Sequence, residues 1–565
     1  MKIKAKIYYS LTVALISIGV ITAAGAADGT LAGSYLAGQF ARNSGDIDAA
    51  IASLRRVHQD DPENMEVASQ LQGMLLLQGN VDEAITLASD IRQIDERDQL
   101  SDLLLALRDI KNHNVDGAAA MLDSVSEAGS AQLWLPLISA WIDVSNNKLA
   151  KPLTLEELSA DVSRAAPLAN YHLALINAQA GFTDAAALNF KNAIEDPKNP
   201  PSRVMELLLR FYKQNGSTVL TPVVNAYHES HPDDTDESVA PSIVTAQDGV
   251  AEVLYTMGGI MLGADVTSDA AIYLQLALYV KPDFAEAALA LGDAYVQLQQ
   301  YAHANDAYAR VTPASPLYIR AQLHIAVNFD RMGKLNDALS MLDKMAKQSP
   351  DDADALITKG DLLRIHSRYR DAVDAYSKAL GRIPELKSSH WPVLFARGAC
   401  FERLGNWAAA ERDLQQALVL KPDQPDVLNY LGYGWMARNE NLADARAMIE
   451  KAVKARPDDA EIVDSMGWAL YLSGDYEGAT EYLEKAVELL PGDPTVNDHL
   501  GDAYWRLGHK TEARYQWERS LSFSPEAKLA DSLHHKLKEG LPPPTTLAGA
   551  VPPDADTNPL SDATP

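Results

Sequence analysis

The sequence predicts an all-α protein made of about fourteen helix-turn-helix repeats. Three sets of residues that return every 34 positions support this prediction. The sets are Gly258, Gly292, Ala326 and Gly360; Ala270, Ala304, Ala338 and Ala372; and Pro282, Pro316, Pro350 and Pro384. A fixed period of this length is the sequence signature of a repeat array, in which each unit buries its apolar face against its neighbours.

Each set has a packing role in a pair of antiparallel helices. A small residue at the eighth and twentieth positions of a unit lets the two backbones approach closely. Glycine inside a helix costs about 1 kcal/mol relative to alanine, so its recurrence at the eighth position indicates a steric need. Proline at the thirty-second position ends the second helix, because it lacks the N–H group and clashes with the preceding turn.

The last unit shows the pattern most clearly. It reads Leu500, Gly501, Tyr504, Ala513, Trp517, Ser520 and Pro525. This series resembles the tetratricopeptide repeat (TPR) family, whose units read L-G-x-x-Y, then A-x-x-x-F, then a closing proline. One departure is Asn497, where the family has a large aromatic residue. The resemblance covers nearly the whole chain after residue 26 and implies a right-handed α-α superhelix.

The repeat frame also divides the chain into segments. The units begin at residues 31, 65, 99, 133, 167, 201, 251, 285, 319, 353, 391, 425, 460 and 494. We expect a signal peptide at 1–26, a degenerate N-terminal array at 27–234, an acidic linker at 235–250, a regular C-terminal array at 251–527, a capping helix at 528–541 and a disordered proline-rich tail at 542–565. The fourth unit is the least regular, since Pro152 stands where a small residue is expected.

The N-terminus has the features of a targeting signal. Three lysines precede an apolar run at 7–24, and the small residues 24–26 follow it. This order is typical of a secretory signal peptide cleaved before about Ala27, and it predicts a periplasmic protein. The alternative is an uncleaved inner-membrane anchor, because the run 7–24 is near the shortest length that spans a bilayer.

Composition and charge limit the partners. The chain carries 77 acidic and 49 basic residues, for a formal charge of −28. This balance argues against nucleic acid, since phosphate binding needs a basic face. A hydrophobic content of 47% fits a soluble folded protein. The single cysteine, Cys400, forms no internal disulfide and is compatible with an envelope compartment.

The search for catalytic and cofactor motifs predicts no enzyme, no cofactor and no metal site. The stretch HESH at 228–231 has its histidines three residues apart, whereas a zinc protease helix needs them four apart. Pro232 follows directly, so a helix terminus is the better interpretation. Cys400 lies beside Gly398 and is interpreted as a small buried residue. The sequence contains no G-x-S-x-G and no phosphate-binding loop.

The TPR resemblance implies a partner-binding groove. In the family the second, fifth, ninth, twelfth and thirteenth positions of the first helix face the concave side, and four of these form one helical stripe. The predicted groove residues are Asn429, Tyr433, Asp464, Trp468, Tyr471, Asp498, Asp502, Trp505 and Arg506. Asp293 and Asp361 hold the ninth position in earlier units. The alternative is that the rings pack on neighbouring helices while the carboxylates act as caps or are solvated.

His499 lies between the packing residues and the groove residues and receives no role. The family's basic clamp for a peptide C-terminal carboxylate is absent, so a ligand of that kind is not expected. The block 427–521 also resembles TPR proteins of proteobacterial envelopes. We therefore expect a non-enzymatic scaffold of the bacterial envelope that binds a protein or peptide. The alternative is a non-catalytic substrate-holding arm of a complex for outer-membrane protein assembly or polysaccharide export.

Overall fold

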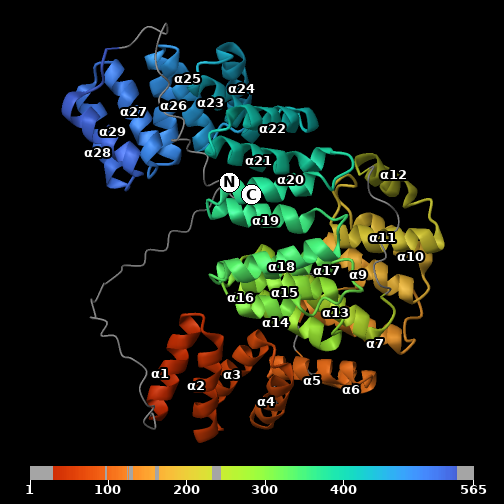
Figure 1. The fold of residues 1–565 in the computed structure, drawn as a ribbon. Coiled ribbons are helices and arrows are strands. Elements are labelled where there is room, and N and C mark those ends of the chain that lie inside the picture. The colour runs from red at the N-terminus through yellow and green to blue at the C-terminus, as the bar shows by residue number, and fades with distance from the viewer. Residues whose placement is uncertain are drawn as a thin grey trace. The chain divides into compact units, whose positions relative to one another are not determined.

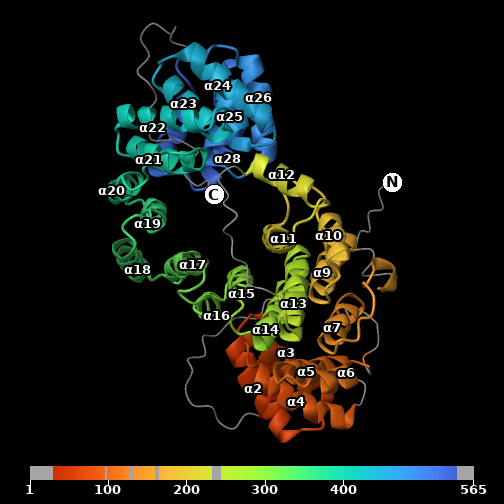
Figure 2. The same ribbon diagram turned by 90° about the vertical axis from the view of Figure 1, so that its right-hand side faces the viewer.

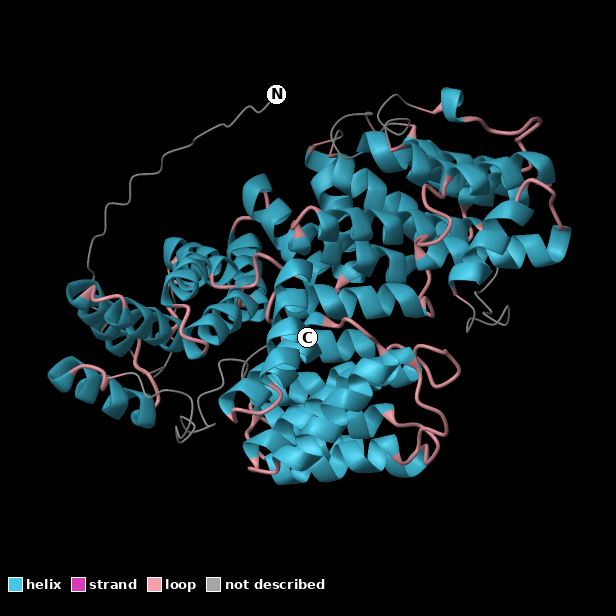
Figure 3. Cartoon of the chain, turned by 90° about the horizontal axis from the view of Figure 1, so that it is seen from above, coloured by secondary structure: helices cyan, strands magenta, loops and turns pink. Residues whose placement is uncertain are grey.

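The computed structural model describes residues 30–95, 98–123, 125, 131–158, 165–231 and 243–543. Several predicted segments lie outside these residues. They are the signal peptide 1–26, residues 235–242 of the linker and residues 544–565 of the tail. In the part of the chain that is described, every regular element is a helix and no strand occurs (Figure 3).

The chain divides into two compact units, Met1–His324 and Ile325–Pro565. The repeat frame places its boundary earlier, at the linker 235–250. The difference arises because the two repeats after this linker pack with the N-terminal repeats.

Paired helices build the first compact unit (Figure 1). Their bounds are α1 Leu31–Asn43, α2 Ile47–Asp60, α3 Met65–Gln78, α4 Val81–Ile94, α5 Gln99–Lys111, α6 Val115–Leu122, α7 Ala131–Ser145, α9 Ala166–Gln179, α10 Thr183–Asn192, α11 Ser202–Asn215, α12 Thr221–Ser230, α13 Ala246–Gly263, α14 Thr267–Val280, α15 Ala285–Gln297 and α16 Tyr301–Tyr308. A short 3-10 helix, η1, covers Leu155–Glu157, and α17, Tyr318–Arg331, crosses the division between the units.

The second compact unit continues the same pairing. Its helices are α18 Leu335–Gln348, α19 Asp354–Ile365, α20 Tyr369–Leu380, α21 Trp391–Arg403, α22 Trp407–Leu420, α23 Pro425–Ala437, α24 Leu442–Ala455, α25 Ala460–Leu472, α26 Tyr476–Leu489, α27 Pro494–Arg506, α28 Lys510–Ser522 and α29 Ala527–Glu539, with a 3-10 helix, η2, at Ser388–His390. The last helix, α29, is unpaired and lies where the capping helix is predicted.

The helix bounds confirm the predicted fold class. The described residues form 28 α-helices in helix-turn-helix pairs. Eight of the fourteen predicted unit starts coincide with the first residue of a helix, and four more differ by one residue. The two larger differences are α7, which begins at 131 instead of 133, and α13, which begins at 246 instead of 251. The extra turn of α13 starts at Thr245, whose hydroxyl accepts the Asp248 N–H in a capping box.

The fourth unit is irregular in the structure as well. After α7, residues 146–158 form turns, an extended stretch and η1 instead of a second long helix. The segment is held by Asn177 of α9, which accepts the Leu153 N–H at 2.9 Å and donates to the Leu153 carbonyl at 2.9 Å. Pro152 favours this conformation, since proline cannot continue a hydrogen-bonded helix.

The hairpin α13–α14 lies against the first helices of the N-terminal repeats (Figure 2). Helix α13 packs on α5, α7 and α9, and α14 packs on α3, α4 and α5. Close approach at one point requires glycine, because an ideal Cβ at Gly249 would lie 2.0 Å from the Trp141 ring. The inner face of the N-terminal repeats is therefore filled by a hairpin of the same chain.

A buried polar cluster joins this hairpin to the N-terminal repeats. Arg203 of α11 donates through Nε and Nη2 to both oxygens of Glu252 on α13, at 3.1 and 2.9 Å. Its third nitrogen donates to Glu286 of α15 at 2.6 Å, and the Tyr171 hydroxyl donates to Glu252, also at 2.6 Å. Glu252 is only 1% exposed, so its charge depends on these donors.

The cluster gives a first prediction. Arg203→Met should lower the free energy of unfolding by about 3–5 kcal/mol, because it leaves the Glu252 carboxylate buried without its cation. Urea denaturation followed by circular dichroism would measure the change. The double variant Arg203→Met/Glu252→Gln removes the stranded charge and keeps an acceptor for Tyr171, so it should recover much of the loss. Equal stability of the wild type and the single variant would contradict this account.

Candidate functional site

The predicted groove residues all lie on first helices of the second compact unit. These helices pack directly on one another, α23 on α25 and α25 on α27, and form one continuous layer. Positions five, nine and twelve of each helix fall on a single stripe of that layer. The polar side chains of the stripe have three different environments in the structure.

In the first environment, the ninth-position aspartates accept a hydrogen bond from the second helix of their own repeat. The donors are aromatic side chains 15 residues later: Tyr308 to Asp293 at 2.6 Å, Tyr376 to Asp361 at 2.7 Å and Trp517 to Asp502 at 2.9 Å. Each ring is fully buried and needs an acceptor for its O–H or N–H. These three aspartates are therefore part of the repeat's own packing.

The glycine before each aspartate makes room for the same ring. An ideal Cβ would lie 2.2 Å from the Tyr308 ring at Gly292 and 2.5 Å from the Trp517 ring at Gly501. Where the second helix presents an aliphatic side chain instead, as Leu483 does opposite Gly467, the next residue is not aspartate. Among the eight regular repeats, aspartate stands at position nine only in the three with tyrosine or tryptophan at position twenty-four.

In the second environment, stripe residues of neighbouring repeats contact each other. Both oxygens of Asp464 on α25 lie 3.0 Å from Nδ1 of His499 on α27. The His499 ring stacks on Trp468 at 4.0 Å between centroids, and Trp468 stacks on Tyr471 at 4.6 Å. Asp464 and Trp468 both contact His499, and Trp468 contacts Tyr471, so these predicted groove residues pack within the chain. His499, which received no role from the sequence, is the residue that joins them.

In the third environment, the chain's own C-terminal segment covers the stripe of the last repeat. Lys536 of α29 donates to Asp498 at 2.7 Å and to Asp502 at 2.9 Å. Arg506 donates to the Tyr471 hydroxyl at 3.1 Å and to the Pro542 carbonyl at 2.5 Å. The predicted groove residues Asp498, Asp502 and Arg506 therefore have internal partners.

Trp505 is covered by the same segment. Its ring packs beside Trp517 at 5.2 Å, and the Lys510 amine lies 3.7 Å from the ring centroid. An ideal Cβ at Gly540, just after α29, would lie 2.0 Å from the Trp505 ring. At the last repeat, the side chains that were predicted to line an open groove are thus covered by the C-terminal segment of the same chain.

Burial and charge shift the pKa values in this cluster. Burial raises the pKa of the Asp502 carboxyl to about 6, although Lys536 acts in the opposite direction. Burial lowers the pKa of His499, but the Asp464 carboxylate more than offsets this effect and the net shift is upward. The folded protein therefore holds the His499 proton more tightly than an unperturbed histidine would.

Two groove residues have no such partners. Asn429 on α23 is fully buried, and neither its amide nitrogen nor its amide oxygen has a hydrogen-bond partner among the described residues. Tyr433, one turn later, is half-buried, and its hydroxyl forms no hydrogen bond in the described part of the chain. Burial raises the pKa of Tyr433, with further contributions from Asp464 and Glu402. The stripe of α23 is thus the part of the predicted groove whose polar side chains lack a hydrogen-bond partner among the described residues.

The other sequence candidates behave as structural residues. Cys400 is fully buried, and burial raises the pKa of its thiol to about 12. The histidines of 228–231 lie at the end of α12, which finishes at Ser230, so the interpretation as a helix terminus is confirmed. No group of three or more His, Cys, Asp or Glu side chains in the described ranges could hold a metal ion.

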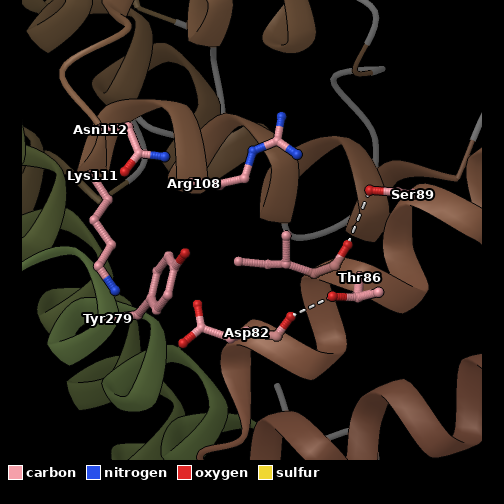
Figure 4. Close-up of a pocket in the computed structure, with 8 residues that line it drawn as sticks. Asp82, Thr86, Ser89, Arg108, Lys111, Asn112 and Tyr279 are labelled. Carbon is pink, nitrogen blue, oxygen red and sulfur yellow. Dashed lines mark hydrogen bonds between the residues drawn. The ribbon is translucent and has the colours of Figure 1, made fainter.

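A cavity of about 470 Å³ lies in the first compact unit, where α14 meets α4 and α5 (Figure 4). Of the residues that line it, Arg108 lies 3.1 Å from Asp109, and the Lys111 amine lies 3.7 Å from the centroid of the Tyr279 ring. Figure 4 shows Tyr279 between Lys111 and Asp82.

Comparison with known families agrees with the helix pairing. One family model, described as tetratricopeptide repeat, matches residues 325–386 and 436–494, and a second model of the same description matches residues 41–108. The matched stretches contain the helix pairs described above. These stretches of the chain are therefore tetratricopeptide repeats.

The similar proteins add little about function. A TPR repeat-containing protein of Pseudomonas aeruginosa is 32% identical over 194 residues, which are 34% of this chain, and the match spans only 32% of that relative's length. Among solved structures, the APC/C hetero-tetramer Cut9–Hcn1 matches with a TM-score of 0.39 at 16% identity, over 91% of this chain and 97% of that chain. YrrB, a TPR protein with an unusual peptide-binding site, matches with a TM-score of 0.27 at 20% identity, over 34% and 91%. Scores of this size place no site in this chain.

Within the residues that the structure describes, no helix is both long enough and apolar enough to span a bilayer.

The contact between glycine and ring gives a second prediction. Gly292→Ala should lower the free energy of unfolding by about 1–3 kcal/mol, because the new methyl group meets the Tyr308 ring. The control is Gly259→Ala on α13, where nothing lies within 4 Å of an ideal Cβ. That variant should be more stable by up to about 1 kcal/mol, as expected from helix propensity. Thermal and urea denaturation would compare them, and equal effects at both positions would contradict the steric account.

The His499–Asp464 pair gives a third prediction, on pH. The folded pKa of His499 lies above its ordinary value of 6.5. The stabilisation is therefore fully present below about pH 6.5 and is lost as the pH rises through the folded pKa. The stability of the wild type relative to His499→Gln should thus fall with rising pH, since glutamine donates to Asp464 but does not titrate.

Urea unfolding at several values from about pH 6 to about pH 9 would test this dependence. His534→Gln on the exposed side of α29 is the matched control and should run parallel to the wild type. If His499→Gln also runs parallel to the wild type, the pair has no linked proton and this account is incorrect.

Proposed function

We propose that this chain is a non-enzymatic scaffold of the bacterial envelope that binds a protein or peptide partner on the inner face of its C-terminal repeats. One observation carries the proposal. On the stripe of α23, the buried Asn429 amide and the half-buried Tyr433 hydroxyl have no hydrogen-bond partner among the described residues, whereas the polar side chains on α25 and α27 are paired within the chain. Buried polar groups are normally hydrogen-bonded, so an unpaired group on this layer favours a partner that supplies the bond.

The N-terminal repeats are a weaker candidate for the binding face. Their first helices are contacted by α13 and α14, and the Gln247 amide already donates to the Lys111 carbonyl at 2.8 Å. A partner would have to displace this hairpin together with the buried Arg203–Glu252 pair. The free energy needed favours binding at the C-terminal repeats instead.

The envelope location rests on the N-terminal sequence. Basic residues, an apolar run at 7–24 and small residues at 24–26 support secretion and a periplasmic location. An inner-membrane anchor through 7–24 is the alternative. Fractionation of cells, with N-terminal sequencing of the mature protein, would decide between them: a chain that starts near residue 27 supports release, and an intact N-terminus in the membrane fraction supports the anchor.

A crosslinking experiment tests the binding face. A photo-reactive phenylalanine analogue at position 433 should capture one discrete protein in intact cells, identified by mass spectrometry. The same analogue at Tyr515, which is 62% exposed on α28, is the control for non-specific capture. The same products from both positions, or none from position 433, would count against the proposed binding face.

A further inference from the structure

Helix α1 has an apolar side that lies open to solvent. Its side chains Leu36 and Phe40 are 66% and 76% exposed and lie one turn apart. Ala32, Gly33 and Ala37 are on the same side of the helix and are also exposed. We call these five residues the α1 stripe. Exposed apolar side chains that are scattered singly are normal, whereas a contiguous group of them marks an interaction surface.

The other large apolar side chains that are exposed are scattered. Among the described residues, no helix besides α1 carries more than one of them. Val419 on α22 is 78% exposed, for example, but Gln415 and Gln416, one turn earlier, are exposed polar residues. The α1 stripe therefore differs from the surfaces of the other described helices.

The remaining sides of α1 are occupied within the chain. Gly38 is buried, and an ideal Cβ there would lie 3.2 Å from a side chain of α2. The Tyr35 hydroxyl donates to Glu66 of α3 at 3.1 Å, and the Gln39 amide donates to Gln70 of the same helix. Helix α1 lies at one end of the N-terminal repeats (Figure 1). Since a repeat contacts only its neighbours, the first unit has one side left without a neighbour.

The C-terminal end of the array has a polar surface instead. Asp531, His534 and Lys538 of α29 are exposed, whereas Leu533 of this helix is fully buried. A polar outer face is the usual end of a repeat array, because it stays soluble without a further repeat. The apolar end at α1 is thus the one that a partner surface would stabilise.

Charge indicates which kind of surface fits the α1 stripe. The chain has a formal charge of −28, so two copies repel each other over most of their surfaces. Arg42 is the only charged residue of α1, and the α1 stripe contains none. A second copy can therefore approach this side of the helix with its own α1 stripe without bringing like charges together.

The order of the side chains along α1 favours the same occupant. In an antiparallel pair of helices related by a two-fold axis, both copies use the same patch and each contact occurs twice. With Leu36 at the axis, Phe40 lies opposite Ala32 of the second copy, because both are four residues from Leu36. A large side chain thus meets a small one, as close packing of two helices requires.

Two other covers fit the α1 stripe less well. A helix that lies on a membrane surface is normally rich in lysine and arginine beside its apolar face, and α1 has Arg42 alone. The chain's own N-terminus is short after the predicted cleavage before Ala27, because only residues 27–29 then precede Thr30. Thr30 already caps α1 by accepting the Gly33 N–H at 3.2 Å.

We propose that the α1 stripe is a dimerisation surface, on which α1 of a second copy of this chain packs antiparallel across a two-fold axis. The dimer covers the apolar end of the N-terminal repeats in both copies at once. Helix α1 has 13 residues and is about 20 Å long. The contact is therefore small, and the dimer should dissociate in the micromolar range.

Sedimentation velocity of the purified chain, with the N-terminus that it has in cells, tests the dimer. Between about 1 and about 100 µM the wild type should shift from the mass of one chain to the mass of two. Phe40→Glu should stay a monomer over this range, which is a rise in Kd of more than about tenfold, because the interface would bury two unpaired carboxylates. Its circular dichroism should match the wild type, since Phe40 is mostly exposed in a single copy.

Val419→Glu is the matched control. Val419 is as exposed as Phe40 but lies on α22, outside the α1 stripe, so this variant should dimerise like the wild type. A control that loses the dimer as completely as Phe40→Glu would show that the added charge acts through general repulsion and that the α1 stripe is not the surface. A wild type that remains a monomer up to about 100 µM would overturn the proposal.

A cysteine at the two-fold axis tests how the two helices are arranged. Leu36→Cys should form a disulfide-linked dimer on mild oxidation with copper phenanthroline, because the two sulfur atoms face each other across the axis. The natural Cys400 is fully buried and should not compete. Val419→Cys, exposed but outside the α1 stripe, should link far more slowly on a non-reducing gel. Equal rates of linking for the two variants would overturn the antiparallel pairing of α1.

Other occupants of the α1 stripe would give different results. If the wild type stays a monomer and floats with vesicles of phosphatidylethanolamine and phosphatidylglycerol, while Phe40→Glu does not, the stripe contacts membranes and the dimer is wrong. If the wild type stays a monomer and a photo-reactive analogue at position 40 links only to a different protein in cells, the stripe serves that protein and the dimer is again wrong.

The dimer and the proposed function are tested separately. Helix α1 belongs to the first compact unit and Tyr433 to the second, so Phe40→Glu should leave the capture at position 433 unchanged. Loss of the dimer together with normal capture at position 433 supports both proposals, whereas a monomeric wild type with normal capture overturns the dimer alone.

Discussion

Close contact between the two helices of a repeat is the constraint on which the whole structure depends. A small residue at the eighth position lets a side chain of the second helix lie over the backbone of the first, as Tyr308 does over Gly292. When that side chain carries an O–H or N–H, the next residue must accept its hydrogen bond, because an unsatisfied buried donor is costly. The glycine–aspartate pair in three repeats follows from this single requirement.

The same requirement explains why aspartate recurs at the ninth position of the first helices. Asp293, Asp361 and Asp502 recur because they accept hydrogen bonds from buried rings. Recurrence on one helical face is therefore not by itself a sign of binding in such an array. The informative residue is the one that breaks the pattern of internal pairing, which is Asn429 on α23.

Each compact unit covers a face of its helices with another part of the same chain. At the C-terminus, α29 continues the repeat frame: Lys536 lies at the position that a ninth residue of a further repeat would take, and it donates hydrogen bonds to both Asp498 and Asp502. In the first compact unit, the hairpin α13–α14 rests on the N-terminal repeats, with Arg203 and Glu252 at its centre. In both cases, helices of the same chain cover part of the inner face of the repeats and reduce the surface that is left for a partner.

The sequence by itself determined the all-α fold, the repeat register and the capping helix, because close helix packing and helix termination act within one 34-residue unit and mark it with glycine, alanine and proline. It also named Asp464, Trp468 and Tyr471 as neighbours on one stripe. Only the tertiary structure decided which stripe residues are paired. His499 meets Asp464 across two repeats, Lys536 covers the last repeat, and α13–α14 packs on helices more than a hundred residues away. Such contacts depend on how the units stack. The repeat frame predicts on which face of its helix a residue lies, but it does not predict which side chain of another repeat that residue contacts.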